Sequence, residues 1–217
     1  MTEVAREISF PPMKNDPWDQ KAARVLVRPL VKTPIHPNHV TIFNILVALI
    51  GCWLITKGDA TSIGWGATLF ALSRFFDHFD GELARQSGKT SKLGYYLDYV
   101  AGGISFGALF LSMGIGFSQS LLGGWAVLLG AAGTFSAVIS VFLNLGIDKA
   151  SKFEEGEAIG YPAFAGFELE DGIYLIAPVA WLGWLEPFFI AAGIGATIYT
   201  LWTAFSLVRL RTRKGTS

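Results

Sequence analysis

The sequence has few charged residues, a single cysteine and no excess of either charge. Of its 217 residues only 16% are charged, and 17 basic side chains balance 17 acidic ones to a formal net charge of zero. Proteins that bind nucleic acid usually carry a basic patch, so this balance gives no support to nucleic acid as a partner. The one cysteine, Cys52, lies in an apolar run, cannot form an internal disulfide and is interpreted as a small buried hydrophobe.

Internal repeats, a separate soluble domain and a signal-peptide pattern are also missing. The first 35 residues are polar, basic and interrupted by prolines, so we expect no cleavable signal peptide there. Apolar sequence, by contrast, is abundant: 52% of the residues are hydrophobic, the mean hydropathy is +0.45, and apolar runs of about 20 residues recur. The pattern excludes an ordinary soluble domain and predicts an all-α, polytopic membrane protein in which strands are essentially absent.

Six transmembrane helices are expected from the apolar runs. Most basic residues lie in the N-terminal segment, the turn at 85–92, the loop near Lys149 and the C-terminal tail. The loops that alternate with these, between spans one and two, three and four, and five and six, contain a single basic residue, Lys57. The positive-inside rule therefore places both termini in the cytoplasm, and we expect an integral protein of a bacterial inner membrane. The spans are placed at about residues 40–57, 63–84, 94–118, 121–145, 170–185 and 187–208.

An amphipathic helix is predicted before the first span, between Pro17 and Lys32. Apolar residues recur there at helical spacing while lysine and arginine form a basic face, and Pro29 should kink or end the regular part. The pattern favours a helix that lies in the headgroup region of the membrane, with the alternative that it binds another protein. We therefore divide the chain into an N-terminal segment, residues 1–36, and a six-helix membrane domain, residues 37–217.

Two acidic residues, Asp77 and Asp80, lie inside the second expected span, where an ionisable group costs at least about 2.5–3.5 kcal/mol to insert. At about 100° per residue, these two acids share one helix face with Gly81 and Ala84. Two carboxylates at such short spacing repel each other unless a divalent cation neutralises them. The small residues leave room for a planar or phosphorylated ligand against the backbone. The face therefore predicts a site for a metal and a nucleotide.

A third acid, Asp98, lies on the third expected span. The turn before this span is short, so the second and third spans are expected to lie side by side as an antiparallel pair, with all three acids at similar depth. Three carboxylates between two helices suit Mg²⁺, or Mn²⁺, because such hard cations prefer oxygen ligands and share them with substrate phosphates. A cation there could bridge a diphosphate and stabilise its charge as a bond to phosphorus breaks.

These residues belong to a longer pattern, Asp77-x2-Asp80-Gly81-x2-Ala84-Arg85-x8-Gly94-x3-Asp98, preceded by Pro37-Asn38-x-Val40-Thr41 before the first span. The pattern resembles the signature of the CDP-alcohol phosphotransferases, also called CDP-alcohol phosphatidyltransferases. The resemblance implies a six-helix membrane transferase of phospholipid biosynthesis, usually a homodimer. Such an enzyme would transfer a phosphatidyl or phosphoalcohol group from a CDP-linked donor to an alcohol acceptor and release CMP.

The resemblance also implies roles for single residues. Asp77, Asp80 and Asp98 would bind the metal. Asp80 would also contact the nucleotide, and Asp98 would also be a catalytic residue. Gly81 and Ala84 would form the surface under the cytidine. Asn38 and Thr41 would help to order the end of the site that binds the nucleotide. Arg85 would partner a phosphate or a motif carboxylate, with a snorkelling cytoplasmic arginine as the alternative. Gly94 would let the third helix approach closely.

One position departs from the family pattern: a fourth aspartate, four residues after the third, is replaced by Gly102. In the family that carboxylate is thought to deprotonate the acceptor hydroxyl, a role typically worth about 10²–10⁴ in rate. Three interpretations stay open. Another acid, such as Glu170 or Asp171 at the start of the fifth span, supplies the base; the metal acidifies the acceptor enough without one; or the protein is a degenerate family member that binds CDP-compounds or lipid without turnover.

Other features near the motif allow more than one interpretation. Glu168, Glu170 and Asp171 could aim a carboxylate at the cavity, or simply cap a helix and complement its dipole. His78 borders the acidic face and could be a catalytic base, a hydrogen-bond donor to the acceptor or a packing residue. The acidic start of the fifth span favours a neutral or amine-bearing acceptor over a phosphorylated one. A transporter that uses the acids as a relay would explain neither the motif spacing nor the short turn.

Overall fold

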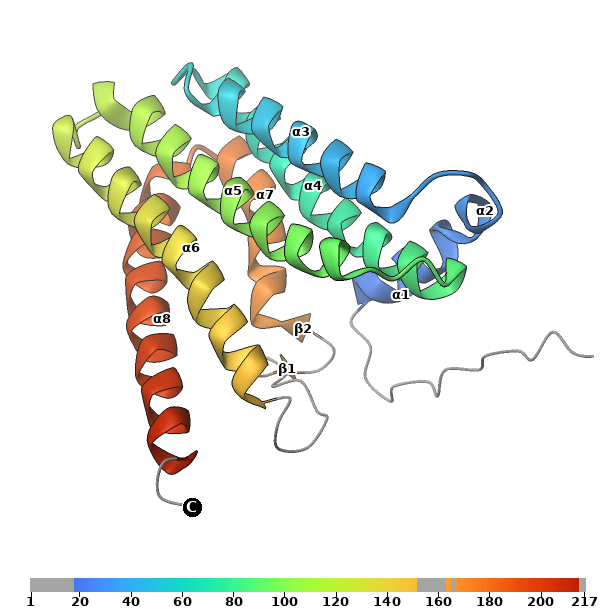
Figure 1. The fold of residues 1–217 in the computed structure, drawn as a ribbon. Coiled ribbons are helices and arrows are strands. Elements are labelled where there is room, and N and C mark those ends of the chain that lie inside the picture. The colour runs from blue at the N-terminus through green and yellow to red at the C-terminus, as the bar shows by residue number, and fades with distance from the viewer. Residues whose placement is uncertain (1–17, 152–162, 165–166, 215–217) are drawn as a thin grey trace, which may run out of the picture.

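The computed structural model describes residues 18–151, 163–164 and 167–214 of the chain, and helices dominate this part (Figure 1). The α-helices are α1 Trp18–Leu26, α2 Arg28–Val31, α3 Pro37–Ile55, α4 Ala60–Ser87, α5 Lys92–Gly116, α6 Gly124–Ser151, α7 Ile176–Trp181 and α8 Leu185–Lys214. The remaining described elements are the 3-10 helices η1 Phe117–Gln119 and η2 Leu169–Leu175, and the strands β1 Ala163–Phe164 and β2 Phe167–Glu168.

The two strands are a small exception to the prediction that strands are absent. Ala163 pairs with Glu168 and Phe164 with Phe167, in an antiparallel ladder two residues long. Strands in globular proteins are usually 3–10 residues long, so this short pair builds no layer of the fold. The described part of the chain is all-α in class, as predicted.

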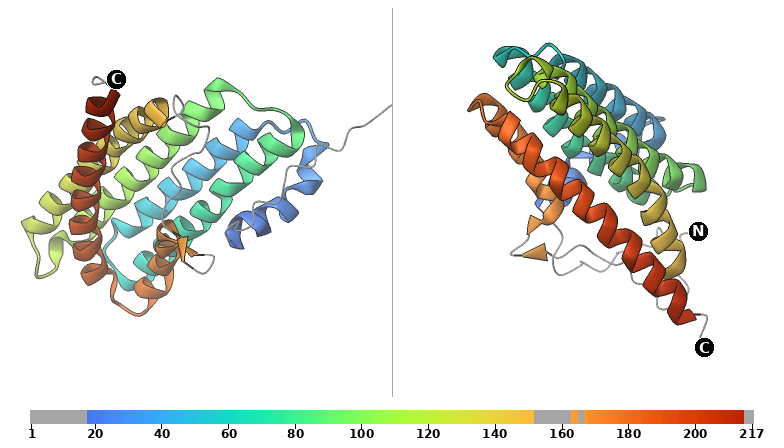
Figure 2. Two further views of the ribbon diagram at one scale, coloured as in Figure 1. Left: turned by 90° about the horizontal axis from the view of Figure 1, so that it is seen from below. Right: turned by 90° about the vertical axis from the view of Figure 1, so that its left-hand side faces the viewer.

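The long helices pack as one bundle (Figure 1, Figure 2). α3 packs against both α4 and α5, α5 against α6, α6 against α8, and the short α7 contacts α4 and α8. The second and third expected spans, α4 and α5, meet through side chains: the rings of Phe70 and Phe106 are 5.8 Å apart and the Arg74 guanidinium lies over Phe106, while α3 packs extensively against both helices. The short turn at 88–91 joins the ends of α4 and α5, and α3 packs against the two of them.

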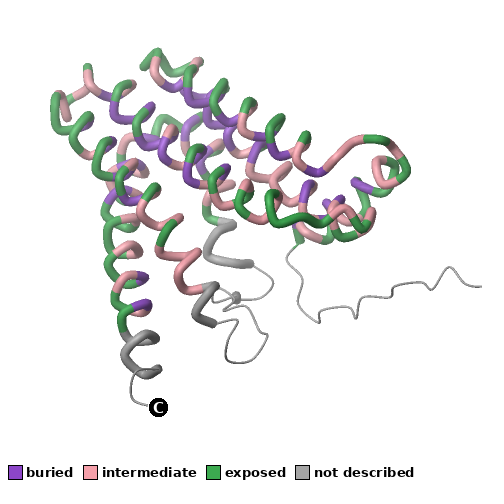
Figure 3. Tube along the Cα trace, in the orientation of Figure 1, coloured by how far each residue is buried: buried purple, intermediate pink, exposed green. Residues whose placement is uncertain are grey.

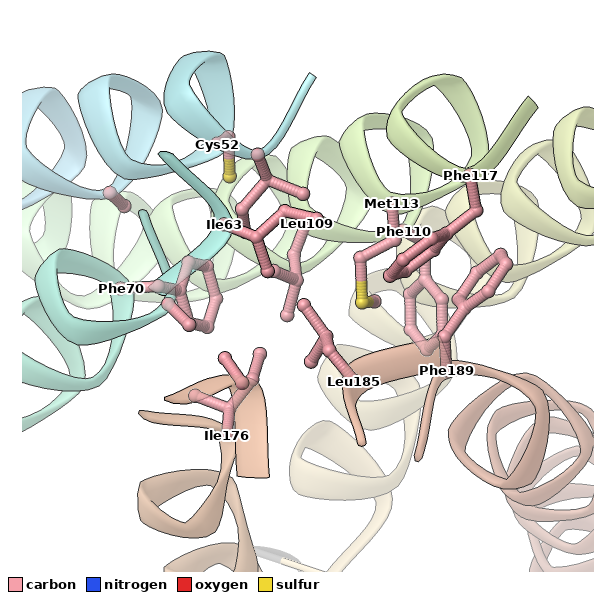
Figure 4. Packing of buried hydrophobic residues seen from close by; sticks show 14 of the residues in the cluster. Cys52, Ile63, Phe70, Leu109, Phe110, Met113, Phe117, Ile176, Leu185 and Phe189 are labelled. Carbon is pink, nitrogen blue, oxygen red and sulfur yellow. The ribbon is translucent and has the colours of Figure 1, made fainter. Parts of the chain in front are cut away.

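The apolar core lies where α3, α4, α5, α7 and α8 meet (Figure 4). Phe70 of α4, Leu109 of α5 and Phe189 of α8 are almost completely buried there. Figure 3 shows that the outer sides of the helices are largely exposed. The exposed residues include large apolar ones such as Phe135 and Phe142 of α6. Apolar residues on both the inside and the outside of a bundle are expected when the surrounding solvent is lipid.

Glycines allow the helices to approach closely. A Cβ atom on Gly66 of α4 would lie 2.5 Å from the carbonyl oxygen of Gly51 in α3, and one on Gly130 of α6 would lie 2.7 Å from the carbonyl oxygen of Phe110 in α5. Real Cβ atoms do not come this near, so a side chain at either position would push the two helices apart. The glycine-rich stretch around residue 130 therefore packs closely in the way that membrane helices favour.

Each helix around the motif begins at a recognisable cap. His36 precedes α3 and its Nδ1 accepts a hydrogen bond from the Asn38 amide, with Pro37 at the first helical position. Asp59 caps α4 in the same way, and the hydrogen bonds from Ser62 hold the pKa of its carboxyl below the usual range. Ser91 caps α5 by accepting from the Gly94 amide at 2.9 Å. These local signals set where the motif helices begin.

The described residues include four helices that are long and apolar enough to cross a membrane: α3, α5 continued through η1, residues Gly124–Ile147 of α6, and residues Leu185–Val208 of α8. α4 has 28 residues, which suffices in length, but it is not among these four. The fifth expected span corresponds to η2 and α7, of which Gly172–Trp181 is apolar but short. The protein is thus an integral membrane protein with at least four candidate spans, and the count of six stays a prediction.

The predicted N-terminal amphipathic helix is divided into α1 and α2 at Val27, just before Pro29, which occupies the first turn of α2. The face of α1 that packs against the bundle contains Asp19 and Ala23, and Val27 just after it is buried as well. Val25 and Leu26 are 56% and 54% exposed and lie away from the bundle, whereas Trp18, 45% exposed, also stacks on Phe75 of α4. That this exposed face contacts lipid headgroups stays a prediction.

Candidate metal and nucleotide site

The three motif aspartates converge. One carboxylate oxygen from each of Asp77 and Asp80 on α4 and Asp98 on α5 lies within 4.8 Å of the others, and we call this set the carboxylate cluster. Asp80 is buried, Asp77 is partly buried and Asp98 is exposed. The cluster is therefore open on the α5 side and closed on the α4 side. Three like charges at this distance repel each other in the absence of a cation.

α3 supplies hydrogen bonds that orient two of the carboxylates. The hydroxyl of Thr41 donates to Oδ2 of Asp80, and Nδ2 of Asn44 donates to Oδ1 of Asp77 at 2.8 Å. Both donors are almost completely buried and are spaced one turn apart on the helix. Thr41 was expected near the nucleotide; the structure places it against a metal-ligand candidate. Sequence reasoning missed Asn44, although a polar residue three positions after Thr41 in an apolar run was a usable signal.

Arg74, one turn before Asp77 on α4, pairs with the same carboxylate. Its Nη2 lies 3.0 Å from Oδ2 of Asp77, and its guanidinium stacks over the ring of Phe106 on α5 at 5.0 Å. The contact holds α4 and α5 in register beside the cluster. One guanidinium cannot balance three carboxylates, so the residues still favour a divalent cation. Sequence reasoning gave Arg74 no role.

The residues present fit a hard divalent cation. All the candidate ligands are carboxylate oxygens, which are the donors that Mg²⁺ and Mn²⁺ prefer. Among the described side chains, Oδ1 of Asn44 is buried with no hydrogen-bond donor, although the amide of the same side chain binds Asp77. A buried acceptor without a partner next to the cluster is what a metal-bound water would satisfy.

We expect Asn44→Leu, which keeps the size of the side chain and removes its amide, to weaken Mn²⁺ binding by about 10–100-fold. Groups that orient metal ligands typically have effects of this size. Mn²⁺ titration of the purified full chain, followed by electron paramagnetic resonance, measures the change. Asn144→Leu is the matched control, because Asn144 bonds Tyr199 between α6 and α8 and touches no aspartate of the cluster. Equal Mn²⁺ affinity in Asn44→Leu and wild type would contradict the role given to Asn44.

The residues expected at the nucleotide lie beside the cluster. Gly81 and Ala84 follow Asp80 on the same helix, and a Cβ on Gly81 would lie 3.5 Å from the Arg85 guanidinium. A Cβ on Gly94 would lie 3.2 Å from Oδ1 of Asn38, so this glycine lets α5 begin close to the start of α3. The absence of side chains at these glycines leaves backbone accessible next to the carboxylates.

Arg85 makes a contact that sequence reasoning did not anticipate. Its Nη2 lies 2.9 Å from Oε1 of Glu82, a buried acid on the same helix that also binds Arg24 of α1 and Gln86. The described ion pairs of Arg85 thus involve Glu82 and none of the three cluster aspartates. About half of its side chain is exposed, which leaves guanidinium nitrogens accessible to a phosphate.

His78 lies on a different side of α4 from the carboxylate cluster. Its Nε2 is 2.8 Å from Oδ2 of Asp19 on α1, and the hydroxyl of Tyr174 in η2 donates to the same oxygen at 2.8 Å. This contact gives no support to His78 as the catalytic base. The side chains of Glu168, Glu170 and Asp171 lie outside the described residues, although the structure includes the backbone of β2 and η2 at these positions.

Gly102 borders open space. It lies one turn after Asp98 on α5, on nearly the same face, and a Cβ built on it meets no atom within 4 Å in the described structure. A Cβ on its neighbour Gly103 would instead lie 2.5 Å from Val141 of α6. The position where the family pattern has a fourth aspartate could therefore accept a longer side chain without a steric clash.

The fold and the site together define a class: a helical membrane protein with a carboxylate cluster for a divalent cation on two motif helices. The chain belongs to the CDP-alcohol phosphatidyltransferase family, whose model matches residues 34–202, and it is a transferase. The resemblance read from the motif is confirmed.

Two named relatives are phospholipid synthases. The archaetidylinositol phosphate synthase of Pyrococcus horikoshii is 24% identical over 181 residues, which cover 74% of this chain and 92% of that protein. The phosphatidylinositol phosphate synthase of Corynebacterium glutamicum is 34% identical over 96 residues, 42% of either chain.

Solved structures share the fold. The phosphatidylinositol phosphate synthase of Mycobacterium tuberculosis with CDP-DAG bound matches with a TM-score of 0.65 at 18% identity, covering 86% of this chain and 94% of that one. The same enzyme with manganese and citrate matches with a TM-score of 0.55 at 20% identity, over 84% and 88% of the two chains.

Proposed function

We propose that the protein transfers a phosphatidyl or phosphoalcohol group from a CDP-linked donor to an alcohol acceptor, with release of CMP, in phospholipid biosynthesis. The observation that carries this proposal is the convergence of Asp77, Asp80 and Asp98 within 4.8 Å, in a chain that belongs to the family. The relatives named as phospholipid synthases, and the fold shared with an enzyme that holds CDP-DAG, support a CDP-linked donor.

In the reaction, an acceptor hydroxyl attacks the phosphorus that carries the alcohol or lipid. A new oxygen–phosphorus bond forms, the bond to the bridging oxygen of the diphosphate breaks, and CMP leaves with that oxygen. The proton of the acceptor hydroxyl passes to a base. A divalent cation held by the cluster aspartates, Mg²⁺ or Mn²⁺, would neutralise charge on the diphosphate. The manganese in a structure of the same fold supports a divalent cation without selecting between the two.

The residues around the cluster divide the remaining tasks. Thr41 and Asn44 hold Asp80 and Asp77 in fixed orientations, so the ligands need no rearrangement when the cation binds. Gly81 and Ala84 leave room for the cytidine beside the helix backbone. With Gly102 at the fourth motif position, we assign the base to Glu170 or Asp171, which begin the segment that packs against α4.

The topology completes the proposal. α4 and the η2–α7 segment are taken as the second and fifth of six spans, and both termini as cytoplasmic, in a bacterial inner membrane. α4 supports this because it packs along α3, which is itself long and apolar enough to span. The division into residues 1–36 and 37–217, and the homodimer that the resemblance implies, are further predictions that cross-linking and truncation of the purified protein can test.

The test is a CMP-release assay on the purified full chain in detergent, with CDP-diacylglycerol as donor and Mg²⁺ or Mn²⁺ present. We expect CMP release that EDTA abolishes and that either cation restores. The alternative, a protein that binds CDP-compounds without turnover, predicts metal-dependent binding of the donor with no CMP release for any acceptor. A CDP-linked soluble alcohol paired with diacylglycerol is the second donor to try. Failure of both binding and release would overturn the proposal.

The acceptor panel should separate two chemical classes. The acids near the start of η2 favour a neutral or amine-bearing alcohol, whereas the two named relatives make inositol phosphate lipids. The described ion pairs engage Arg74 with Asp77 and Arg85 with Glu82. Arg74 would have to exchange its partner to receive an acceptor phosphate, whereas the half-exposed Arg85 keeps guanidinium nitrogens accessible. The assay should therefore compare CMP release with free inositol, glycerol, serine or ethanolamine as acceptor to CMP release with inositol phosphate.

A further inference from the structure

Asp19 on α1 is a buried carboxylate that the proposed reaction does not use. Its residue is 2% exposed, and both oxygens have hydrogen-bond partners. Oδ1 accepts from the backbone amide of Gln20 at 2.8 Å, and Oδ2 lies 2.8 Å from both the Tyr174 hydroxyl and Nε2 of His78. A buried charge is stable only when it is paired and hydrogen-bonded in this way. We call Asp19, His78 and Tyr174 the Asp19 cluster.

The Asp19 cluster joins three elements that are far apart in the sequence. Tyr174 belongs to η2 and is separated from Asp19 by 155 residues, and His78 lies on α4 directly after Asp77 of the carboxylate cluster. The ring of Trp18 reinforces the junction, because it stacks on Phe75 of α4 at 6.1 Å and contacts the ring of Tyr174 at 5.5 Å. α1 therefore connects η2 to the motif helix.

The junction lies on a different side of α4 from the two cluster aspartates of that helix. Taking Asp77 as 0° and about 100° per residue, Asp80 lies near −60°, while Phe75 and His78 lie near 160° and 100°. The contacts of α1 thus approach α4 from a different side than the nucleotide and the cation do. The described contacts of Asp19 therefore involve His78, Tyr174 and the Gln20 amide, and no aspartate of the carboxylate cluster.

A second set of contacts fixes the direction of α1. Arg24, in the last turn of α1, pairs with the buried Glu82 at 3.5 Å, and Nε2 of Gln86 donates to the backbone oxygen of Arg24 at 2.9 Å. Asp19 contacts residue 78 and Arg24 contacts residues 82 and 86, so α1 runs parallel to the C-terminal half of α4. Tied at both of its ends, α1 can hold a third element against α4.

We propose that Asp19 is a positioning residue, which fixes residues 169–175 against α4 through Tyr174 and His78 and so sets where the acids of η2 lie relative to the carboxylate cluster. The inference rests on the proposed function, because Glu170 and Asp171 matter only if they serve the reaction. η2 packs against α4, and Tyr174 is three residues from Asp171, less than one helical turn. His78 acts through Asp19 and is not itself the base.

The experiment compares Tyr174→Phe and Asp19→Asn with wild type in the purified full chain. Tyr174→Phe removes only one hydroxyl, so it remains informative if Asp19→Asn fails to fold. Backbone amide exchange of residues 169–175 should be about tenfold faster in Tyr174→Phe, because a hydrogen bond to a charged group is lost. The rate kcat of CMP release should fall about tenfold in both variants, at unchanged KM for the CDP-linked donor and unchanged Mn²⁺ affinity.

Two matched controls separate positioning from a general loss of stability. Tyr199→Phe removes a hydroxyl that bonds Asn144 between α6 and α8, and Asp59→Asn changes an exposed capping acid at the other end of α4. Neither should alter exchange at residues 169–175 or kcat. Unchanged exchange in Tyr174→Phe would overturn the proposal, as would faster exchange with unchanged kcat. The absence of CMP release from wild type would contradict the proposed function instead. The amide-exchange comparison of Tyr174→Phe with wild type would still test whether the Asp19 cluster holds residues 169–175.

Discussion

Asp80→Asn is expected to abolish metal binding and to lower the rate of CMP release by about 10³-fold or more. The substitution keeps the size of the side chain and an oxygen that can accept the hydrogen bond from Thr41, but it removes the most buried of the three cluster charges. Bound metal ions supply several kcal/mol of transition-state stabilisation, and about 1.4 kcal/mol corresponds to a tenfold change in rate. CMP release under saturating donor and Mn²⁺ measures the effect.

The same substitution should have the opposite effect on stability when metal is absent. Three carboxylates within 4.8 Å of one another repel, so removing one charge should raise the Tm in EDTA above that of wild type. Wild type should gain Tm when Mn²⁺ is added, because a ligand that binds only the folded state stabilises it, and Asp80→Asn should lose that gain. Thermal unfolding in detergent, with EDTA and with Mn²⁺, measures both the higher Tm without metal and the loss of the Mn²⁺-induced rise in Tm.

Asp59→Asn is the matched control for this prediction. Asp59 lies on the same helix, caps its first turn and is outside the carboxylate cluster, and asparagine caps a helix about as well as aspartate. We expect its CMP release and its Mn²⁺-induced rise in Tm to match wild type. If Asp80→Asn retained either the turnover or the rise in Tm, the carboxylate cluster would not be the metal site.

The parts of the fold that sequence could predict are those with local causes. The first three spans are expected to begin at about residues 40, 63 and 94, and the helices begin at Pro37, Ala60 and Lys92, because each follows a capping residue that acts on the amides of the first turn. The convergence of Asp77 and Asp80 also has a local cause, since residues three apart share a helix face. The position of α3 against both motif helices has no such signal, because it depends on glycine contacts such as Gly51 with Gly66.

The contacts that sequence reasoning missed are long-range and polar. Asp19 lies at the boundary of an amphipathic pattern, and its partner Tyr174 is 155 residues away, so no periodicity connects them. The hydrophobic pattern of α1 assigned the apolar residues to one face, yet the bundle buries Asp19 together with Ala23 because a paired charge can occupy a buried position. Hydropathy alone cannot distinguish such a face from a solvated one.

Removing both acids at the start of η2, in the double variant Glu170→Gln and Asp171→Asn, is expected to lower kcat by about 10²–10⁴-fold, the usual contribution of a general base. Mn²⁺ affinity should be unchanged, because the metal is assigned to Asp77, Asp80 and Asp98. The two single variants identify which acid is responsible. Glu186→Gln is the matched control, since this acid bonds Ser120 near the first turn of α8 and lies in no part of the proposed site.

Gly102→Asp, introduced into that double variant, should restore turnover by at least about tenfold. The new carboxylate would lie about 6 Å along α5 from Asp98 on nearly the same face, where a Cβ meets no atom within 4 Å. Gly103→Asp is the control, because its Cβ would collide with Val141 on α6. Restoration by Gly102→Asp alone would show that the η2 acids and the missing fourth aspartate perform the same task. Unchanged turnover in the double variant would instead leave Glu170 and Asp171 as helix-capping residues and favour activation of the acceptor by the metal alone.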